Sequence, residues 1–408
     1  MMGRVVVIGG GAAGFFGAIA CARAMASLGI SHAQVILLEA AASPLAKVKI
    51  SGGGRCNVTH SCFDPRLLVH NYPRGGRELG GAFARFQPQD TIAWFAQEGV
   101  KLKTEADGRI FPVSDRSETI MDCLGQAASQ AGVQLRCSSP VKQVVKTSQG
   151  FTIALANGQT LASDRLLLAT GSSRDGYRIA EELGHQVITP VPSLFTLKLP
   201  EPKLHQLAGV SVAIARLKYG DHQQTGALLI THWGMSGPAM LKLSAWAARN
   251  LAEAGYRGEI QINWLPEYAQ ISDHLATTKT DHGKRNLANY RPFSQIPQRL
   301  WQFLIERSGI NPQLNWADLS QKHLHTLTEQ LTRGIYPFAG RGIYKDEFVT
   351  CGGVHLKEVD FKTMASRVCP GLYLAGEVLD LDGVTGGFNF QSAWTTGYLA
   401  GEAIARSW

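Results

Sequence analysis

The residues RVVVIGGGAAGFFGAIA, at positions 4–20, decide the fold of this chain. In residues 4–8, Arg4 is followed by an unbroken run of β-branched apolar residues, which is typical of a buried parallel strand. Gly9, Gly11 and Gly14 follow with the spacing of a G-x-G-x-x-G turn, and the apolar residues after them recur at helical spacing. The next strand, VILLE, ends in Glu39. We therefore predict a βαβ unit and a Rossmann-type α/β fold at the start of the chain.

This unit has the parts that bind a dinucleotide. Gly9 turns the chain, Gly11 lets the backbone approach a pyrophosphate, and Gly14 allows close packing of helix on strand. Glu39 lies somewhat farther from the turn than the usual interval of about 20 residues, because SHAQ precedes its strand. Its carboxylate accepts hydrogen bonds from ribose hydroxyls and repels a 2′-phosphate, which favours FAD or NAD over NADP. The alternative is a purely structural glycine turn.

Two later segments favour FAD. DRLLLATGSS (164–173) is a second buried strand that ends in Thr170 and Gly171, where the backbone comes close to a cofactor. GLYLAGEVLDLDGVTGGFNFQSAWTTGYLAGEAIA (371–405) supplies another strand, the acid Glu377, a second glycine turn and a final helix. A cofactor held from both ends of the sequence fits the long FAD better than NAD.

The middle of the chain has a different pattern. Residues 193–262 contain short alternating runs that predict a β-rich module, and residues 267–333 are polar and helical. We therefore predict an FAD-binding domain interrupted by a β-barrel-like module and a helical module. The expected boundaries are 1–192 for the first part of the FAD-binding domain, 193–266 for the β-rich insert, 267–334 for the helical insert, 335–348 for the return, and 349–408 for the last part.

Composition limits the class of protein. The 408 residues are 45% hydrophobic and 18% charged, and the net charge of +8 favours either a polyanionic partner or simply a slightly basic enzyme. The seven cysteines form no CxxC and no zinc-site spacing, so we expect reduced thiols, no metal and a cytoplasmic location. The apolar start fits a strand and glycine turn rather than a signal peptide. No run of roughly 18 apolar residues predicts a membrane span.

The loop SGGGRCN (51–57) is the most unusual stretch of the sequence. Three glycines allow backbone amides to lie against a pyrophosphate or flavin, and Arg55 adds positive charge near anions. A plain surface turn is the alternative. The thiol of Cys56 could donate a proton near the flavin, or it could be a small buried packing residue.

Together these motifs carry a family resemblance. The glycine turn with Glu39, KISGGGRCNVTH (49–60), GRIFPVSDRSETIMDCL (108–124), THWGMSGPAML (231–241) and the segment 349–394 occur in this order over essentially the whole chain. They resemble the HI0933-like flavoproteins, also called the BaiN/RdsA family of NAD(P)/FAD-dependent oxidoreductases. One departure is the run Ala46-Lys47-Val48-Lys49, where the family usually has glycine followed by two basic residues.

The resemblance implies cofactor and activity. It implies that the glycine turn, Glu39 and the 51–57 loop contact FAD, that Glu377 binds near the ribityl chain, and that the turn 386–391 faces the flavin ring. The full set of predicted cofactor contacts is Gly9, Gly11, Ala12, Ala13, Gly14, Glu39, Ser51, Gly52, Gly53, Gly54, Arg55, Cys56, Asn57, Val141, Thr170, Gly171, Gly376, Glu377, Gly386, Gly387, Asn389 and Phe390. The family activities implied are reductions of activated C=C bonds, in steroid enones or in uridine of large-subunit ribosomal RNA.

Catalytic candidates are few. Cys56 is one, and His232 is another, with a role either as a hydrogen-bonded core residue or as a substrate contact. Ser236 before Gly237-Pro238 has the pattern of a helix N-cap, with an anion or substrate site as the alternative. Asp380 and Asp382 either shape a turn or contact the cofactor. GRIFPVSD (108–115) is expected to cover the flavin edge or to lie at a domain junction, and its arginine and aspartate could equally form a structural pair.

These observations lead to one function and two alternatives. We expect an FAD-dependent reductase that uses NAD(P)H as a transient reductant and acts on a uridine of ribosomal RNA. The first alternative is a reductase of small-molecule enones, and the second is a flavoprotein that binds RNA or a partner without turnover. No membrane association is expected, and the oligomeric state stays open.

Overall fold

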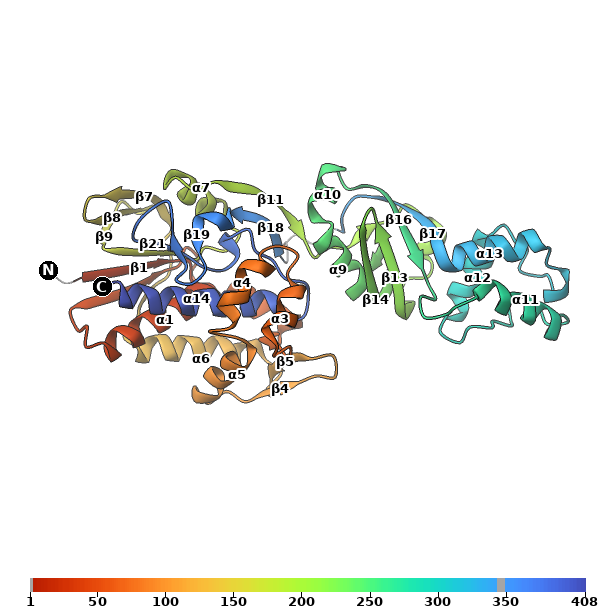
Figure 1. The fold of residues 1–408 in the computed structure, drawn as a ribbon, viewed down its shortest axis with the longest axis horizontal. Coiled ribbons are helices and arrows are strands. Elements are labelled where there is room, and N and C mark those ends of the chain that lie inside the picture. The colour runs from red at the N-terminus through yellow and green to blue at the C-terminus, as the bar shows by residue number, and fades with distance from the viewer. Residues whose placement is uncertain (1–2, 343–348) are drawn as a thin grey trace. The chain divides into compact units, whose positions relative to one another are not determined.

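The computed structural model describes residues 3–342 and 349–408 (Figure 1). Its contacts divide into two compact units, one made of Met1–Pro190 with Val349–Trp408 and the other of Val191–Phe348. The first unit is therefore assembled from both ends of the sequence, and the second is an insertion. Its limits fall beside the predicted boundaries at 193 and 348. Residues 343–348 of the predicted return segment lie outside the described residues.

A seven-stranded sheet forms the centre of the first unit, in the order β19-β20-β21-β10-β1-β2-β6. Five neighbouring strands, from β21 to β6, are parallel, and the β19–β20 edge is antiparallel. Val5, Val6 and Val7 of β1 are fully buried, as expected for a central parallel strand covered on both faces. The strands are β1 (Gly3–Ile8), β2 (Ala33–Leu38), β6 (Gln134–Arg136), β10 (Arg165–Leu168), β19 (Val359–Asp360), β20 (Ala365–Ser366) and β21 (Leu372–Leu374).

The first and last helices of the chain pack along each other beside this sheet. α1 (Ala12–Ser27) follows the glycine turn, and α14 (Phe388–Arg406) ends the chain (Figure 1). They approach closely because glycines line the contact: a Cβ at Gly401 would lie 2.3 Å from the carbonyl oxygen of Gly17. Residues almost four hundred positions apart thus form one layer of the nucleotide-binding fold.

Smaller elements complete the first unit. β3, β5 and β4 form one antiparallel sheet, β7, β8 and β9 form another, and β11 pairs with β18 where the chain leaves and re-enters the unit. The strands are β3 (Thr59–His60), β4 (Leu102–Thr104), β5 (Arg109–Pro112), β7 (Val141–Thr147), β8 (Gly150–Leu155), β9 (Thr160–Ser163), β11 (Val187–Ser193) and β18 (Val349–Val354). The helices are α2 (Ala46–Gly54), α3 (Pro65–Leu68), α4 (Gly76–Phe83), α5 (Pro88–Gln97), α6 (Ser117–Gln130) and α7 (Arg174–Glu182).

The second unit contains an antiparallel sheet in the order β12-β15-β14-β13-β16-β17. Its two edges meet, because Leu197 of β12 bridges Arg341, which follows β17, so the sheet is nearly a closed barrel. This confirms the predicted β-barrel-like insert. The strands are β12 (Leu197–Lys198), β13 (Ser211–Tyr219), β14 (His222–Thr231), β15 (Gly234–Ser236), β16 (Arg257–Asn263) and β17 (Gly334–Ala339).

The helices of the second unit share a hydrophobic core with its sheet. One cluster of buried side chains runs from Leu197 through Trp264, Trp301 and Trp316 to Phe338. The two modules that the sequence separates at residue 266 therefore belong to one packed body. The helices are α8 (Pro202–His205), α9 (Pro238–Trp246), α10 (Ala248–Glu253), α11 (Ile271–Asp281), α12 (Gln298–Arg307) and α13 (Gln321–Arg333).

No helix within the described ranges is long and apolar enough to cross a membrane.

Candidate functional site

The glycine turn leaves the start of α1 open. Gly11 caps this helix without any side-chain hydrogen bond, and a Cβ placed on it would meet no atom within 4 Å. Glu39 lies beside the turn: its carboxylate accepts hydrogen bonds from the N–H of Gly10 at 2.7 Å and from that of Ala41 at 2.7 Å. The free N–H groups of a helix N-terminus and an adjacent fixed carboxylate are the two features that hold a pyrophosphate and a ribose.

Two other segments close on the same turn. A Cβ at Gly9 would lie 2.4 Å from the carbonyl oxygen of Ala169, and one at Gly376 would lie 2.8 Å from the Cβ of Ala13. The structure therefore brings the ends of β1, β10 and β21 together at one edge of the sheet. In an open α/β sheet this edge, at the carboxyl ends of the strands, is where ligands bind.

Lys47 bridges the segments that follow β10 and β21, although no role was predicted for it. Its ammonium group donates to Oε2 of Glu377 at 2.5 Å and to Oγ of Ser172 at 3.0 Å. The other oxygen of Glu377 accepts the N–H of Thr350 at 2.9 Å. The only sequence signal for Lys47 is its place in the run 46–49, which departs from the family pattern.

The residues at this edge fit an FAD. Thr170 carries a buried hydroxyl that has no hydrogen-bond partner in the part of the chain that the structure describes. Gly171, next to it, has a left-handed backbone with φ of 60°, and a Cβ there would approach Glu377. An unsatisfied buried hydroxyl, open helix N–H groups and a Cβ-free cradle are the features expected around a dinucleotide.

A second group of residues surrounds the SGGGRCN loop. The loop ends the irregular helix α2: Ser51 is extended, and Gly52, Gly53 and Gly54 are left-handed, with φ of 57°, 70° and 82°. A Cβ at Gly53 or Gly54 would meet no atom within 4 Å. Backbone amides are therefore presented without side chains, which is the arrangement predicted for contact with a cofactor.

Asn57 ties this loop to the start of α14. With its amide oriented to satisfy both neighbours, it accepts the N–H of Gly387 at 2.9 Å and donates to the carbonyl oxygen of Thr59 at 3.0 Å. Asn389 holds the same turn by exchanging two hydrogen bonds with Gly383, each 2.8 Å long. The structure thus brings the predicted loop 51–57 and the glycine turn 386–387 together.

His60 belongs to this second group, although the sequence did not single it out. Its ring stacks on Phe388 at a centroid distance of 4.7 Å, and its Nε2 lies 3.2 Å from the carbonyl oxygen of Asp107. The signal was present in the motif NVTH, three residues beyond Asn57, but nothing in the spacing distinguished it.

Arg55 does not face the cofactor edge as a free cation. Its guanidinium pairs with Glu105 at 2.6 Å and with Asp115 at 3.5 Å, and it lies over the ring of Phe111. Its positive charge is therefore already paired with two carboxylates, and its contact with the cofactor stays a prediction. Arg109 pairs with Glu105 and Asp107 instead of Asp115, which also corrects the pair suggested for GRIFPVSD.

Cys56 is completely buried and has a left-handed backbone with φ of 59°. Burial raises the pKa of its thiol to about 12, with a hydrogen bond to Ser51 acting in the opposite direction. The thiol is therefore protonated at neutral pH. This protonation state is the one required of a proton donor, while complete burial is the property of a packing residue. The donor role stays a prediction.

His232 and Ser236 belong to the second unit. His232 is exposed and contacts the ring of Trp233, so the suggestion that it is a core residue is wrong, while its role as a substrate contact stays a prediction. Ser236 does not cap α9: it pairs with Leu229 as the last residue of β15, and Gly237 takes the N-cap position with φ of 99°. The strand ladder fixes the backbone of Ser236 and removes it from the cap.

Several predicted positions have structural partners. Asp382 is buried and paired with Arg74, Asp380 accepts the N–H of Gly352 at 3.0 Å, and Gln391 is buried in hydrogen bonds with Thr59, Thr91 and Thr395. The side chain of Gln391 therefore stabilises the packing of α14 and is not directed to a ligand.

Two other predicted positions have apolar surroundings. Val141 is buried at the start of β7, and Phe390 stacks on Trp394.

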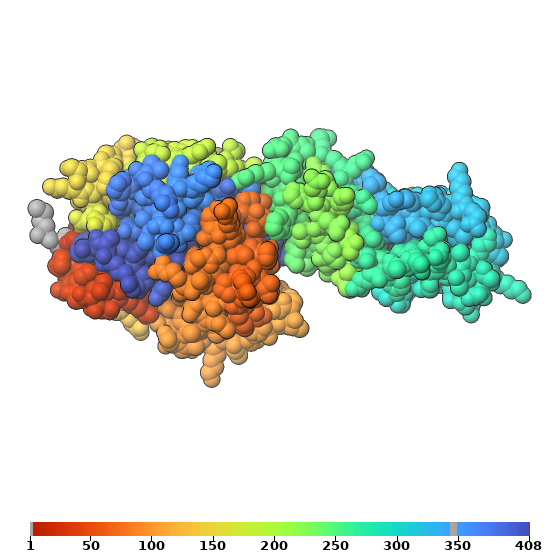
Figure 2. Space-filling view, in the orientation of Figure 1, coloured from red at the N-terminus to blue at the C-terminus, as the bar shows by residue number. Residues whose placement is uncertain are grey.

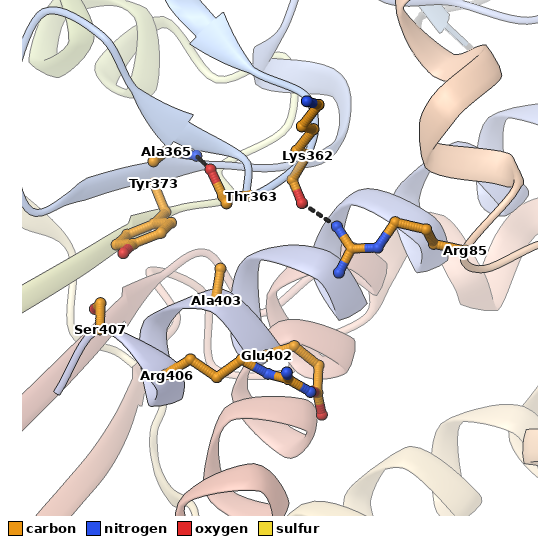
Figure 3. Close-up of a pocket in the computed structure, with 9 residues that line it drawn as sticks. All are labelled: Arg85, Lys362, Thr363, Ala365, Tyr373, Glu402, Ala403, Arg406 and Ser407. Carbon is orange, nitrogen blue, oxygen red and sulfur yellow. Dashed lines mark hydrogen bonds and ion pairs between the residues drawn. The ribbon is translucent and has the colours of Figure 1, made fainter.

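A cavity of about 430 Å³ in the first unit lies away from these residues (Figure 3). It is bordered by the last turns of α14, whereas the candidate cofactor residues Asn389 and Phe390 are in the first turn of this helix. At a rise of about 1.5 Å per residue, Glu402 is roughly 20 Å along the helix from Phe388. The cavity is lined by Arg85, Lys362, Thr363, Ala365, Tyr373, Glu402, Ala403, Arg406 and Ser407.

Comparison with known proteins identifies the family. The model of the HI0933-like protein Rossmann domain matches residues 3–403. The chain belongs to this family. It is 32% identical to the ribosomal RNA dihydrouridine synthase of Escherichia coli, with 98% of this chain and 97% of the relative covered. It is 31% identical to the 3-dehydro-bile acid delta(4,6)-reductase of Clostridium scindens, with 99% of each covered.

Solved structures support the fold. The 3-ketosteroid-delta4-(5alpha)-dehydrogenase of Rhodococcus jostii matches with a TM-score of 0.52 at 14% identity, covering 99% of this chain and 97% of that one. Family and fold together confirm the predicted Rossmann-type FAD-binding fold with its inserted antiparallel sheet. The chain is accordingly a Rossmann-fold flavoprotein oxidoreductase of the HI0933-like family.

Proposed function

We propose that this chain is an FAD-dependent reductase of an activated C=C bond, with NAD(P)H as reductant and a uridine of large-subunit ribosomal RNA as substrate. The overall reaction consumes NAD(P)H and a proton, and it converts the C5=C6 bond of the uracil ring into a single bond. FAD would supply the hydride in such a reaction. The observation that carries the proposal is the meeting of the 51–57 loop with the glycine turn at Gly387, through Asn57.

The described residues have separate tasks in this proposal. The start of α1, Glu39 and Thr170 would hold the dinucleotide part of FAD, because they offer N–H groups, a carboxylate and an unpaired hydroxyl at one sheet edge. The glycines of the 51–57 loop and Gly387 would lie against the flavin. Cys56 is the proposed proton donor, and its buried thiol is protonated over the physiological pH range.

Charge favours RNA over a small enone. The insertion 191–348 contains 17 lysines and arginines against 12 aspartates and glutamates, so it carries +5 of the net charge of +8. Phosphate contacts from such cations supply most of the affinity for nucleic acid. A base within folded RNA must be unstacked before its ring can be reduced, and the protein must hold the backbone while this happens.

The bile-acid reductase relative favours a second candidate, reduction of a small-molecule enone. Both substrates present a C=C bond conjugated to a carbonyl group, so the same site chemistry could serve either. Of the two substrates, only RNA requires a basic protein surface for binding.

Two experiments test the proposal. The purified protein, once denatured, is expected to release FAD into the supernatant, as identified by HPLC. Mass mapping of ribosomal RNA from a strain lacking this gene is expected to show the loss of a dihydrouridine, which the wild-type gene restores. Unchanged ribosomal RNA together with rapid turnover of steroid enones would favour the second candidate. A flavoprotein oxidised by neither substrate would favour the non-catalytic alternative.

A further inference from the structure

The segment 282–297 of the second unit joins α11 to α12 without a helix or strand of its own. Connections of more than about 12–15 residues without secondary structure are uncommon in compact domains and are usually functional or disordered. Figure 2 shows this part of the chain, in blue-green, on the visible surface of the second unit.

Hydrogen bonds and buried side chains fix its backbone. The N–H of Leu287 donates to the carbonyl oxygen of Leu314 at 2.9 Å, and the N–H of Trp316 donates to that of Arg285 at 3.0 Å. The indole of Trp301 donates to the carbonyl oxygen of Leu287 at 2.9 Å, and the indole of Trp316 to that of Tyr290 at 3.1 Å. Leu287, Trp301 and Trp316 are fully buried. The segment is thus an ordered platform.

The platform presents positive charge. Lys284 and Arg285 are exposed, and residues 279–291 contain four lysines and arginines against the single acid Asp281. The guanidinium of Arg285 lies 5.6 Å from the ring centroid of Tyr290, and the ring of His282 lies 4.5 Å from the same ring. The guanidinium is thereby held against an aromatic ring that also contacts the ring of His282.

These charges are not neutralised. Among the described residues, no carboxylate forms an ion pair with Lys284, Arg285 or Arg291. By contrast, Arg307 pairs with Glu201 and Arg333 pairs with Glu329 in the same unit. Unpaired cations that lie close together in the chain repel one another, and an anionic partner would relieve this repulsion.

We propose that the segment 282–291 is an RNA-contacting surface, at which Lys284 and Arg285 bind backbone phosphates. This inference rests on the proposed ribosomal RNA substrate and names the part of the protein that holds it. Arg285 offers a planar guanidinium that can bind phosphate in bidentate fashion or stack on an unpaired base. A protein partner is less suited, because no exposed large hydrophobic side chain falls within these ten described residues, and interface cores are rich in such side chains.

Binding of single-stranded RNA by the full-length, FAD-loaded protein tests the proposal. A fluorescein-labelled oligouridine is titrated with protein, and anisotropy is recorded over a range of KCl concentrations. We expect Lys284→Ala/Arg285→Ala to weaken binding roughly tenfold and to lower the slope of log affinity against log salt by about 1.4, since each phosphate contact on a single strand contributes about 0.7. Lys284→Ala alone is expected to lower the slope by about half as much.

A matched double variant, Lys101→Ala/Lys142→Ala, removes two exposed cations from the first unit and is expected to bind like wild type. FAD content and thermal unfolding of each variant verify that the fold is intact. Wild-type affinity and slope in Lys284→Ala/Arg285→Ala, or an equal loss in the control, would overturn the RNA-contacting surface and leave the proposed substrate standing. Failure of the wild-type protein to bind RNA would instead remove the ribosomal RNA substrate itself.

Discussion

Single side chains join parts of the candidate site that are distant in sequence, and Lys47 is the clearest example. Its ammonium group contacts Ser172 and Glu377, which follow two different strands of the central sheet. The Lys47 side chain is half exposed, so this ion pair adds little to the stability of the fold. Glu377 is one of the predicted cofactor contacts. We therefore propose that Lys47 contributes to cofactor binding.

Lys47→Ala should weaken FAD binding. The change removes the cation that contacts Ser172 and Glu377, and it leaves the carboxylate of Glu377 without its ion pair. Losing one charged hydrogen bond costs about 1.5–3 kcal/mol, which is roughly a ten- to hundredfold loss of affinity. Titration of the apoprotein with FAD measures this loss of affinity. Lys49→Ala, an exposed neighbour, serves as the control and should bind FAD normally. Equal affinity in Lys47→Ala and wild type would remove Lys47 from the site.

Cys56→Ala tests the proposed proton donor. If the thiol donates the proton, the variant should keep its FAD, while oxidation of the reduced holoenzyme by substrate slows by roughly 10²-fold or more. The oxidation rate of Cys56→Ser should lie between those of the wild type and Cys56→Ala, because a hydroxyl is a weaker acid than a thiol. Stopped-flow absorbance at the flavin band measures this half-reaction separately from reduction by NAD(P)H. Normal oxidation of Cys56→Ala would leave the buried thiol as a packing residue.

At the scale of elements, the contact between α1 and α14 determines whether the two ends of the chain form one nucleotide-binding fold. A Cβ at Gly401 would lie 2.3 Å from the carbonyl oxygen of Gly17 and 2.7 Å from the backbone nitrogen of Cys21. Both atoms belong to the backbone, so they move only if the whole helix moves. Gly125 in α6 provides a contrast, because a Cβ there would meet nothing within 4 Å.

Gly401→Ala should therefore destabilise the protein, whereas Gly125→Ala should stabilise it. Overpacking at the helix contact costs about 1–3 kcal/mol of unfolding free energy. Replacing glycine by alanine in an open helix position gains about 0.5–1 kcal/mol. Urea unfolding followed by circular dichroism measures both changes. A stabilised Gly401→Ala would show that α1 and α14 are farther apart than the structure has them.

At the scale of the whole molecule, the predicted cofactor residues all belong to the first unit, and the RNA-contacting surface belongs to the second. β11 and β18 pair with each other where the chain leaves and re-enters the first unit, so the two ends of the insertion start from neighbouring strands. This arrangement separates cofactor binding and substrate binding into parts that can be tested independently.

Replacing residues 194–348 with a short glycine–serine linker should leave FAD binding intact. The linker keeps β11 and β18 whole, and changing loop length alters closure entropy by only about 0.6 kcal/mol per doubling, so affinity should stay within roughly threefold of wild type. Oligouridine binding should be lost. FAD titration and anisotropy measure the two properties. A shortened protein that shows no cooperative unfolding would demonstrate that the first unit depends on the insertion.

The sequence by itself determined the nucleotide-binding core, because the relevant signals are local. The β-branched run 4–8, the glycine spacing and the helical apolar pattern each depend on neighbouring residues, and β1, α1 and β2 appear where they were expected. The inserted sheet and the helices α12 and α13 were readable for the same reason. Ser236 was misread as a cap because pairing across a ladder overrides a local capping pattern.

Only the tertiary structure decided which side chains meet. The contact of Lys47 with Glu377 joins residues 330 positions apart, and the hydrogen bond of Thr59 with Gln391 joins residues 332 positions apart. The ion pair of Arg55 with Glu105, 50 positions away, was likewise not predicted. Ion pairs and hydrogen bonds depend on distances in space, which a sequence pattern does not encode. The periodicity of strands and helices depends only on the order of the residues, so it can be recognised in the sequence.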